Sequence, residues 1–370
     1  MGHGDIYLKC VAIRTKVVPR DYFASLDFSL DVFIFLEEFI MEGKKRMLSG
    51  IKPTGKLTLG NYIGAIKQFI TYQDEYEMFV FIADLHSLTL PIDAKELRQN
   101  TKDLISIYLA CGLDPEKVVL FKQSDIHEHA ELGYIMLCNS NMGELSRMTQ
   151  YKDKTSKLSS NESIPTGIYI YPTLMAADIL LYDPDYIPVG IDQKQHVELT
   201  RDLAIRFNSR YSETFKVVEP VVAKTGAKIN SLSNPEKKMS KSESDKGTIY
   251  LLEDLAITRK KIMSAVTDSG SEIIFDSVNK PGISNLLTIL SCLTSTPIEQ
   301  LVDKYNGQGY GTFKKAVADV VCNELEHLQQ KVKEIQESKI IDKVLEEGAM
   351  KASYVARKKL AKVYRKVGLR

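Results

Sequence analysis

Two apolar runs of strand length, separated by one amphipathic helical segment, constrain this fold more than any other feature. Residues 77–83 (EMFVFIA) and 117–123 (KVVLFKQ) each hold consecutive apolar residues, as in strands buried on both sides. Between them, residues 93–111 place apolar side chains at helical spacing, and Gly112 follows as a C-cap signal. This order predicts an α/β fold with a doubly wound parallel sheet covered by helices on both faces.

The rest of the chain divides into two further parts. Additional strands are predicted at residues 47–51 and 187–189, and additional helices at residues 172–181 and 200–208. From about residue 254 the chain is mostly helical, with Pro281 and Pro297 as interruptions. We therefore predict an α/β domain over residues 47–247 and an all-helical domain over residues 248–370. Residues 1–46 precede the first strand, and we interpret them as an appendage or as the product of a misplaced start, with Met41 or Met47 as the true one.

Composition excludes several classes of protein. The net charge of +1 gives no overall field for nucleic acid, so any RNA binding would depend on local basic patches. The five cysteines are scattered and form no CxxC or Cys/His cluster. We therefore expect neither a structural zinc site nor a disulfide framework, and interpret the cysteines as reduced core thiols.

No segment of the sequence is typical of a membrane span or of a signal peptide. The most apolar stretch, residues 32–41, is short and contains Glu37 and Glu38. Arg14 and Arg20 fit an organellar transit peptide, but acidic residues such as Asp21 argue against one. We predict a cytoplasmic protein with no membrane or DNA partner.

A glycine-rich segment follows the first predicted strand. Residues 53–61 (PTGKLTLGN) place Gly55 and Gly60 where a helix opens, so that the backbone and the helix N-terminus can approach a phosphate. Thr58 and Asn61 add short polar side chains to the first turn. This pattern alone is weak, because ordinary strand-to-helix turns share it.

A second signature, KMSKS at residues 238–242, makes the phosphate-binding interpretation of the first one specific. Lys238 and Lys241 lie three residues apart among small polar residues, and two ammonium groups can follow the negative charge that builds on a leaving pyrophosphate. A phosphate-facing turn followed by such a loop is what adenylate formation from ATP requires. The pair resembles a class I aminoacyl-tRNA synthetase, with residues 58–61 (TLGN) at the His-Ile-Gly-His signature of that class.

Further blocks sharpen the resemblance to the bacterial-type tryptophanyl-tRNA synthetases, from about Met47 to the C-terminus. The blocks are residues 50–55, 84–86, 143–150, 171–172, 174–180, 188–196, 265–269 and 280–287. The resemblance implies a Rossmann-like catalytic domain and a helical domain for the tRNA anticodon. It also implies ATP with Mg²⁺, L-tryptophan and tRNA(Trp) as reaction partners, no dedicated metal site in the protein, and a homodimer.

The resemblance assigns site residues one by one. Catalytic roles fall to Thr58, Asn61, Lys238, Lys241 and Ser242. ATP contacts fall to Lys52, Pro53, Thr54, Gly60, Asn61, Lys154, Gly190, Ile191, Asp192, Ile229, Lys238, Met239, Ser240, Lys241 and Ser242, although Lys154 reads equally well as a surface lysine. Tryptophan contacts fall to Asp178, Met175, Tyr171, His86, Gln193, Ile187 and Val189.

Asp178 carries the specificity in this assignment. A carboxylate in an apolar helix is costly to bury without a donor, and by itself it reads as a structural cap. The resemblance gives it the indole N–H of tryptophan. Loss of that donor would leave the acid unpaired, so phenylalanine would be rejected. His86 alone would read as a packed core histidine.

Some positions depart from the family pattern, and some alternatives stay open. Lys52, Ile191 and Leu48 stand where glutamine, glutamate and an aromatic residue are frequent, which bears on substrate affinity. The alternatives are tyrosyl-tRNA synthetase, a regulatory paralogue without activity and a small-molecule adenylyltransferase. Residues 351–370 carry basic and no acidic side chains, and form either a solvated helix face or an RNA contact.

Overall fold

The computed structural model describes residues 44–155, 163–190, 193–219, 221–222, 227–239 and 246–369. Residues Lys45–Arg370 form one compact unit. Residues 1–43 lie outside the described part, and with them nearly all of the predicted N-terminal appendage. Within the described ranges, no helix is both long enough and apolar enough to cross a membrane.

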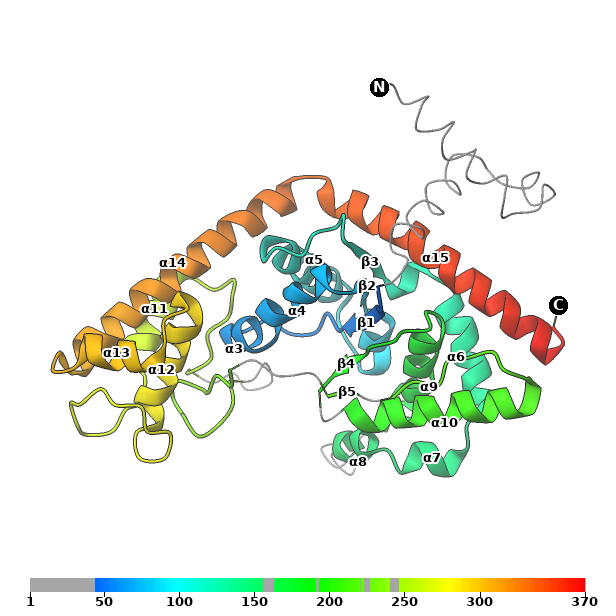
Figure 1. Cartoon of the computed structure of the whole chain (residues 1–370), viewed down its shortest axis with the longest axis horizontal. Helices are drawn as coiled ribbons and strands as arrows, with labels where there is room; N and C mark the ends of the chain where they lie inside the picture. The colour runs from blue at the N-terminus through cyan, green and yellow to red at the C-terminus, as the bar shows by residue number, and fades with distance from the viewer. Residues whose placement is uncertain are drawn as a thin grey trace, which may run out of the picture. The chain divides into compact units, whose positions relative to one another are not determined.

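A parallel sheet forms the centre of the α/β region (Figure 1). β1 (Arg46–Ile51), β2 (Glu77–Ile82) and β3 (Val118–Lys122) pair in the order β1-β2-β3, and β4 (Pro188–Val189) pairs with β5 (Val221–Val222). The segment before β4 joins the two groups, because Leu48 N–H donates to the Tyr186 carbonyl at 3.1 Å and Tyr186 N–H to the Arg46 carbonyl at 3.0 Å. The order β3-β2-β1-β4-β5 confirms the predicted fold class. All these pairings are parallel, and the order of the strands along the chain changes direction between β1 and β4.

Helical segments connect these strands. They are α3 (Leu59–Asn61), η2 (Tyr62–Ile66), α4 (Lys67–Thr71), η3 (Tyr72–Asp74), η4 (Leu85–Thr89), α5 (Ala94–Ala110), η5 (Gln123–Asp125), α6 (Glu128–Asn139), α7 (Met142–Ser146), α8 (Thr149–Thr155), α9 (Thr166–Leu180) and α10 (Lys194–Tyr211). α5 matches its prediction, since Asp93 caps its first turn and Gly112 follows its end with a φ of +104°. α9 and α10 begin earlier than predicted, because burial of Ile168 and His196 extends them beyond the local signal.

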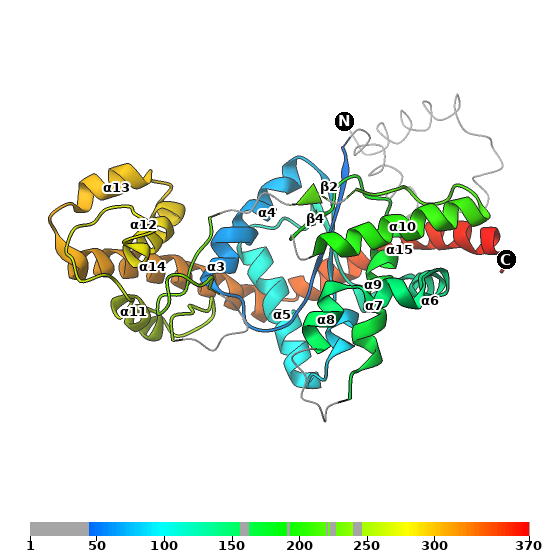
Figure 2. The ribbon, with the colours of Figure 1, turned by 90° about the horizontal axis from the view of Figure 1, so that it is seen from below.

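The two faces of the sheet are buried in separate cores. Alternate strand residues point to opposite faces. Met47 and Met78 therefore pack with α5, whereas Leu48 and Phe79 pack with α6, α9 and α10. Figure 2 shows α5 and α10 against the strands from a second direction. Helices on both faces leave the carboxyl ends of the strands as the open edge.

The C-terminal part is helical, as predicted. It consists of α11 (Leu255–Met263), α12 (Pro281–Thr294), α13 (Ile298–Tyr305), α14 (Gly309–Glu337) and α15 (Ile340–Val367). Asp254 caps α11, Pro281 opens α12 and Pro297 precedes α13, so the two prolines interrupt the helices where expected. α11 and α12 pack on α14, whereas α15 contacts β3 and α6 (Figure 1).

The last helix thus packs on the α/β region, although it follows the predicted boundary at residues 247/248. A Cβ on Gly348 would lie 1.9 Å from the Leu120 carbonyl oxygen, so α15 can cross β3 this closely only with glycine there. Two of its basic side chains form ion pairs with the α/β region, Arg357 with Glu128 and Lys359 with Asp183. The boundary itself stays a prediction.

Candidate active site

A cavity of about 330 Å³ opens at the carboxyl ends of β1 and β4, where the strand order reverses. This is the position at which doubly wound sheets bind ligands. Its lining from the two strands and the residues after them is Leu48, Ser49, Gly50, Lys52, Ile187, Pro188, Val189 and Gly190. β2, η4, α8, α9 and the start of α10 supply the other walls.

The cavity brings together every side chain predicted to contact tryptophan. Those residues are Asp178, Met175, Tyr171, His86, Gln193, Ile187 and Val189. Tyr171, Met175 and Asp178 stand at i, i+4 and i+7 of α9, so helical geometry puts them on one face. The individual roles stay predictions, but the residues line the same cavity.

Asp178 is the most deeply buried charged group of the cavity, with 1% of its surface exposed. Its Oδ1 accepts hydrogen bonds from Gln123 Nε2 and His129 Nδ1, each at 2.7 Å, and its Oδ2 bonds His86 Nε2 at 2.8 Å. Burial alone would raise the pKa of Asp178. The hydrogen bonds from His129 and His86 outweigh burial and lower the pKa to about 2.

This geometry changes the argument made from the sequence. There, Asp178 was expected to depend on the ligand for a donor, and loss of that donor was expected to leave it unpaired. Among the described residues, three side chains already donate to it. An empty or mismatched pocket therefore does not leave the carboxylate unpaired, and rejection of phenylalanine needs another cause.

Sequence reasoning missed the groups behind Asp178. Gln123 and His129 are fully buried, and His129 Nε2 also lies 2.9 Å from the Tyr182 hydroxyl. A signal for Gln123 was present, because it ends the buried strand run at the edge where ligands bind. His129 had no comparable signal. His196 was missed as well, although it holds the Tyr171 hydroxyl at 2.7 Å.

The glycine-rich turn is organised by a capping box. Thr58 N–H donates to Asn61 Oδ1 at 3.1 Å, and Asn61 N–H donates to Thr58 Oγ1 at 3.2 Å. Thr58 has no exposed surface, whereas Asn61 is half-buried. The structure therefore gives Thr58 a capping contact, and its predicted catalytic role is untested.

The first signature contacts both the segment that follows the KMSKS residues and Met239 within them. Leu59 N–H donates to the Ile249 carbonyl and Leu251 N–H to the Leu57 carbonyl, each at 2.9 Å. A Cβ on Gly60 would lie 3.3 Å from the Met239 Cβ, so the glycine permits this close approach. The start of the KMSKS segment therefore packs on the turn that carries the first signature.

The remaining predicted ATP residues are distributed as follows. Lys52 and Gly190 line the main cavity, Lys52 and Pro53 line a neighbouring cavity of about 210 Å³, and Thr54 N–H donates to the Lys52 carbonyl at 2.9 Å. Ile229 and Met239 are buried and joined by a Met239 N–H bond to the Ile229 carbonyl at 3.0 Å. Ile191, Asp192, Ser240, Lys241, Ser242 and the side chain of Lys154 lie outside the described residues.

Comparison with known proteins identifies the family of this chain. The profile of the family described as tRNA synthetases class I (W and Y) matches residues 41–326. The chain therefore belongs to the class I tRNA synthetases of the tryptophan and tyrosine type, and it is an aminoacyl-tRNA ligase.

Within that class, the similar curated proteins are tryptophan–tRNA ligases. Those of Caldanaerobacter subterraneus and Bacillus subtilis are each 51% identical over 88% of this chain and 98% of their own length. Among solved structures, tryptophanyl-tRNA synthetase from Campylobacter jejuni, complexed with ADP and tryptophan, has a TM-score of 0.78 and 36% identity, covering 88% of this chain and all of that one. The synthetase from Mycoplasma pneumoniae has a TM-score of 0.75 and 41% identity, covering 88% of this chain and 98% of its own.

Proposed function

We propose that this enzyme activates L-tryptophan with ATP and transfers it to the 3′ end of tRNA(Trp), with Asp178 as the acceptor of the indole N–H. One observation carries the assignment of Asp178. A carboxylate offers about four acceptor positions. Oδ1 already has two donors and Oδ2 has one among the described residues, so one position on Oδ2 suits a ligand donor.

The geometry also accounts for rejection of phenylalanine. Its ring would fill the apolar walls but would place a C–H against Oδ2, where tryptophan places a donor. Phenylalanine thus lacks a charge-assisted hydrogen bond, which contributes roughly 1.5–3 kcal/mol. Tyr171 and Gln193, at the same cavity, hold the α-amino group common to all amino acids.

In the first step, the tryptophan carboxylate oxygen attacks the α-phosphorus of ATP in line. The new C–O–P linkage forms as the bond to the pyrophosphate oxygen breaks, and pyrophosphate leaves with the electron pair. No general base is needed, because the nucleophile is already an anion. Lys238 and Lys241 neutralise the charge that develops on the leaving group.

In the second step, the 2′-hydroxyl oxygen of the terminal tRNA adenosine bonds to the activated carbonyl carbon as the bond from that carbon to the phosphate oxygen breaks. AMP leaves, and the hydroxyl proton passes to its phosphate. Mg²⁺ enters with ATP on the phosphate oxygens. Within the described ranges, no group of three His, Cys, Asp or Glu residues is placed to hold a metal ion. The C-terminal helices are proposed to contact the anticodon.

We further propose a cytoplasmic homodimer. Support comes from exposed apolar side chains on elements that pack around α9, namely Leu88 on η4, Tyr134 on α6 and Met142 on α7, each more than half exposed. Sedimentation velocity should give twice the monomer mass, and Tyr134→Asp with Met142→Asp should give monomers. A monomeric wild type would contradict the dimer.

Amino-acid-dependent ATP–pyrophosphate exchange tests the proposed reaction. Tryptophan, tyrosine and phenylalanine are compared in parallel at saturating ATP, with exchange in the absence of amino acid as the blank. We expect exchange with tryptophan alone. Exchange with tyrosine would indicate a tyrosyl-tRNA synthetase. Absence of exchange with all three amino acids would support the paralogue without activity.

A further inference from the structure

Asn285 of α12 makes a paired contact with the backbone of Asn230. Asn230 N–H donates to Asn285 Oδ1 at 2.9 Å, and Asn285 Nδ2 donates to the Asn230 carbonyl at 2.9 Å. Asn285 has 5% of its surface exposed. Its side-chain amide therefore pairs with both backbone polar groups of one residue outside its own helix, as a neighbouring strand would.

Asn230 in turn holds the segment that carries Lys238. The two residues form an antiparallel bridge, and Met239 N–H donates to the Ile229 carbonyl at 3.0 Å on the same ladder. Asn230 Nδ2 also donates to the Pro235 carbonyl at 2.6 Å, which closes the turn between the two sides. A shift of Asn230 would thus move the backbone of Lys238.

Residues 265–266 join this hairpin to α14, through one backbone hydrogen bond and one side chain. Val266 N–H donates to the Leu232 carbonyl at 2.8 Å, and Lys314 Nζ donates to the Ala265 carbonyl at 2.7 Å. A Cβ on Gly282 would lie 2.1 Å from the Val266 carbonyl oxygen, so α12 reaches this segment only because of glycine.

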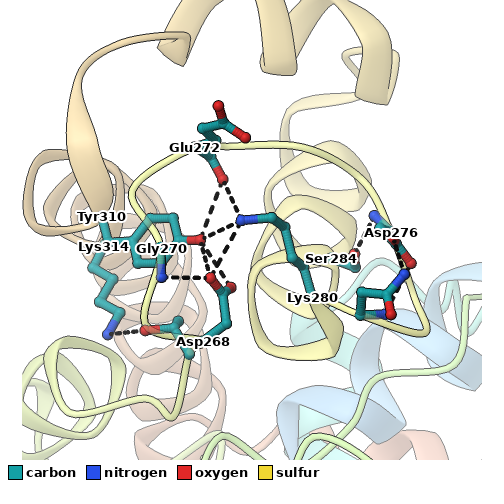
Figure 3. A network of polar contacts seen from close by, with 10 residues as sticks. Asp268, Gly270, Glu272, Asp276, Lys280, Ser284, Tyr310 and Lys314 are labelled. Atoms are coloured by element: carbon teal, nitrogen blue, oxygen red, sulfur yellow. Dashed lines mark hydrogen bonds and ion pairs between the residues drawn. The ribbon is translucent and has the colours of Figure 1, made fainter.

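An ion pair and hydrogen bonds also hold the start of α12. Figure 3 shows the Lys280 ammonium beside Asp268 and the Tyr310 hydroxyl. The Tyr310 hydroxyl also donates to the Asp268 carboxylate at 2.8 Å. Within the described residues, α12, α14 and the hairpin at residues 229–239 are therefore joined through short, buried or half-buried contacts.

We propose that Asn285 is a positioning residue for adenylate formation, which holds Lys238 in register through the backbone of Asn230. Asn285 lines neither described cavity at the active site, so it acts through another residue and is not catalytic. The inference rests on the proposed role of Lys238 in neutralising pyrophosphate. It assigns to α12 a part in the chemical step, beyond its proposed part in tRNA binding.

The test replaces the amide by an isosteric acid. Asn285→Asp keeps an acceptor for the Asn230 N–H but loses the donor and sets a carboxylate against the Asn230 carbonyl. Thr288→Val is the matched control, because Thr288 lies one turn further along α12 and its hydroxyl bonds only within the helix. Asn285→Gln keeps the amide and serves as the conservative variant.

We expect Asn285→Asp to lower kcat of tryptophan-dependent exchange at least tenfold, with the Kd for tryptophan unchanged within twofold. The kcat of Thr288→Val should stay within twofold of wild type, and Asn285→Gln should lower kcat less than Asn285→Asp does. A fall in exchange that only follows the folded fraction, measured by circular dichroism, would overturn the inference. So would an equal effect of Asn285→Asp and Thr288→Val.

A double-mutant cycle separates this inference from the function on which it rests. In a Lys238→Ala background, Asn285→Asp should lower kcat less than twofold further, because the group that it positions is already gone. If Asn285→Asp lowers kcat as much in the Lys238→Ala background as in wild type, the inference is overturned. The proposed function is unaffected by that result, provided that the wild type exchanges with tryptophan. Absence of that wild-type exchange would instead refute the proposed function.

Discussion

The two ends of the active site are built in opposite ways. At the amino-acid end, Asp178 and His129 are fully buried and hydrogen-bonded before any ligand arrives. At the phosphate end, Lys238 is exposed on a short hairpin, and Asn61 is half-buried. Buried contacts fix a pocket shape, whereas exposed lysines stay hydrated until a charged group approaches. Under the proposed function, the folded protein thus provides the buried acceptor for the side chain, whereas the exposed ammonium group of Lys238 is available to a phosphate.

Removal of a lysine should affect only the phosphate end. Lys241→Ala should lower the rate of adenylate formation about 100-fold or more, because loss of one preorganised charge at a reacting phosphate commonly costs that much. Single-turnover ATP consumption measures the rate, and equilibrium dialysis measures the Kd for tryptophan. A parallel rise in that Kd would show that the two ends are not separable.

Replacement of the buried carboxylate should affect only the amino-acid end. Asp178→Asn should raise the KM for tryptophan about 10- to 100-fold and narrow the gap to phenylalanine, because a hydrogen bond to a charged acceptor is lost. Asp125→Asn is the control, since Asp125 is partly exposed and pairs with Lys122 at 3.0 Å. If Asp178→Asn prefers tryptophan over phenylalanine as strongly as wild type does, the pocket is wrongly assigned.

Acid should remove the contribution that Asp178, at the amino-acid end, makes to the stability of the protein. The pKa of Asp178 is lowered from 3.8 to about 2, so its contribution to stability is present above pH 3.8 and lost as the pH falls through 2. The shift corresponds to about 2 kcal/mol. Urea unfolding should show wild type losing this margin over Asp178→Asn between pH 5 and pH 2. A constant difference would contradict the contacts of Asp178.

The smallest effect is expected from the capping threonine. Thr58→Val should lower the free energy of unfolding by about 1 kcal/mol, the usual cost of losing an N-cap hydrogen bond. It should lower exchange far less than Lys241→Ala. Thermal unfolding and exchange kinetics on the same preparations measure both. A loss of exchange as large as that of Lys241→Ala would restore the catalytic role that the sequence suggests for Thr58.

The strands could be predicted because their signals are local, whereas the membership of the pocket was predicted from the family resemblance. A continuous apolar run can only be a buried strand or helix core, and residues 77–83 and 117–123 were the right length for strands. Tyr171, Met175 and Asp178 share a face through helical spacing alone. The early starts of α9 and α10 were not predictable, because they depend on burial against distant segments.

The sequence by itself determined the order of elements, the two signatures and the reaction class, since each is written in adjacent residues. Tertiary structure alone decided that Asp178 has donors from η4, η5 and α6, and that Asn285 pairs with Asn230. These pairs are far apart in the chain. A hydrogen bond acts over about 3 Å, so only the folded backbone can bring such groups together.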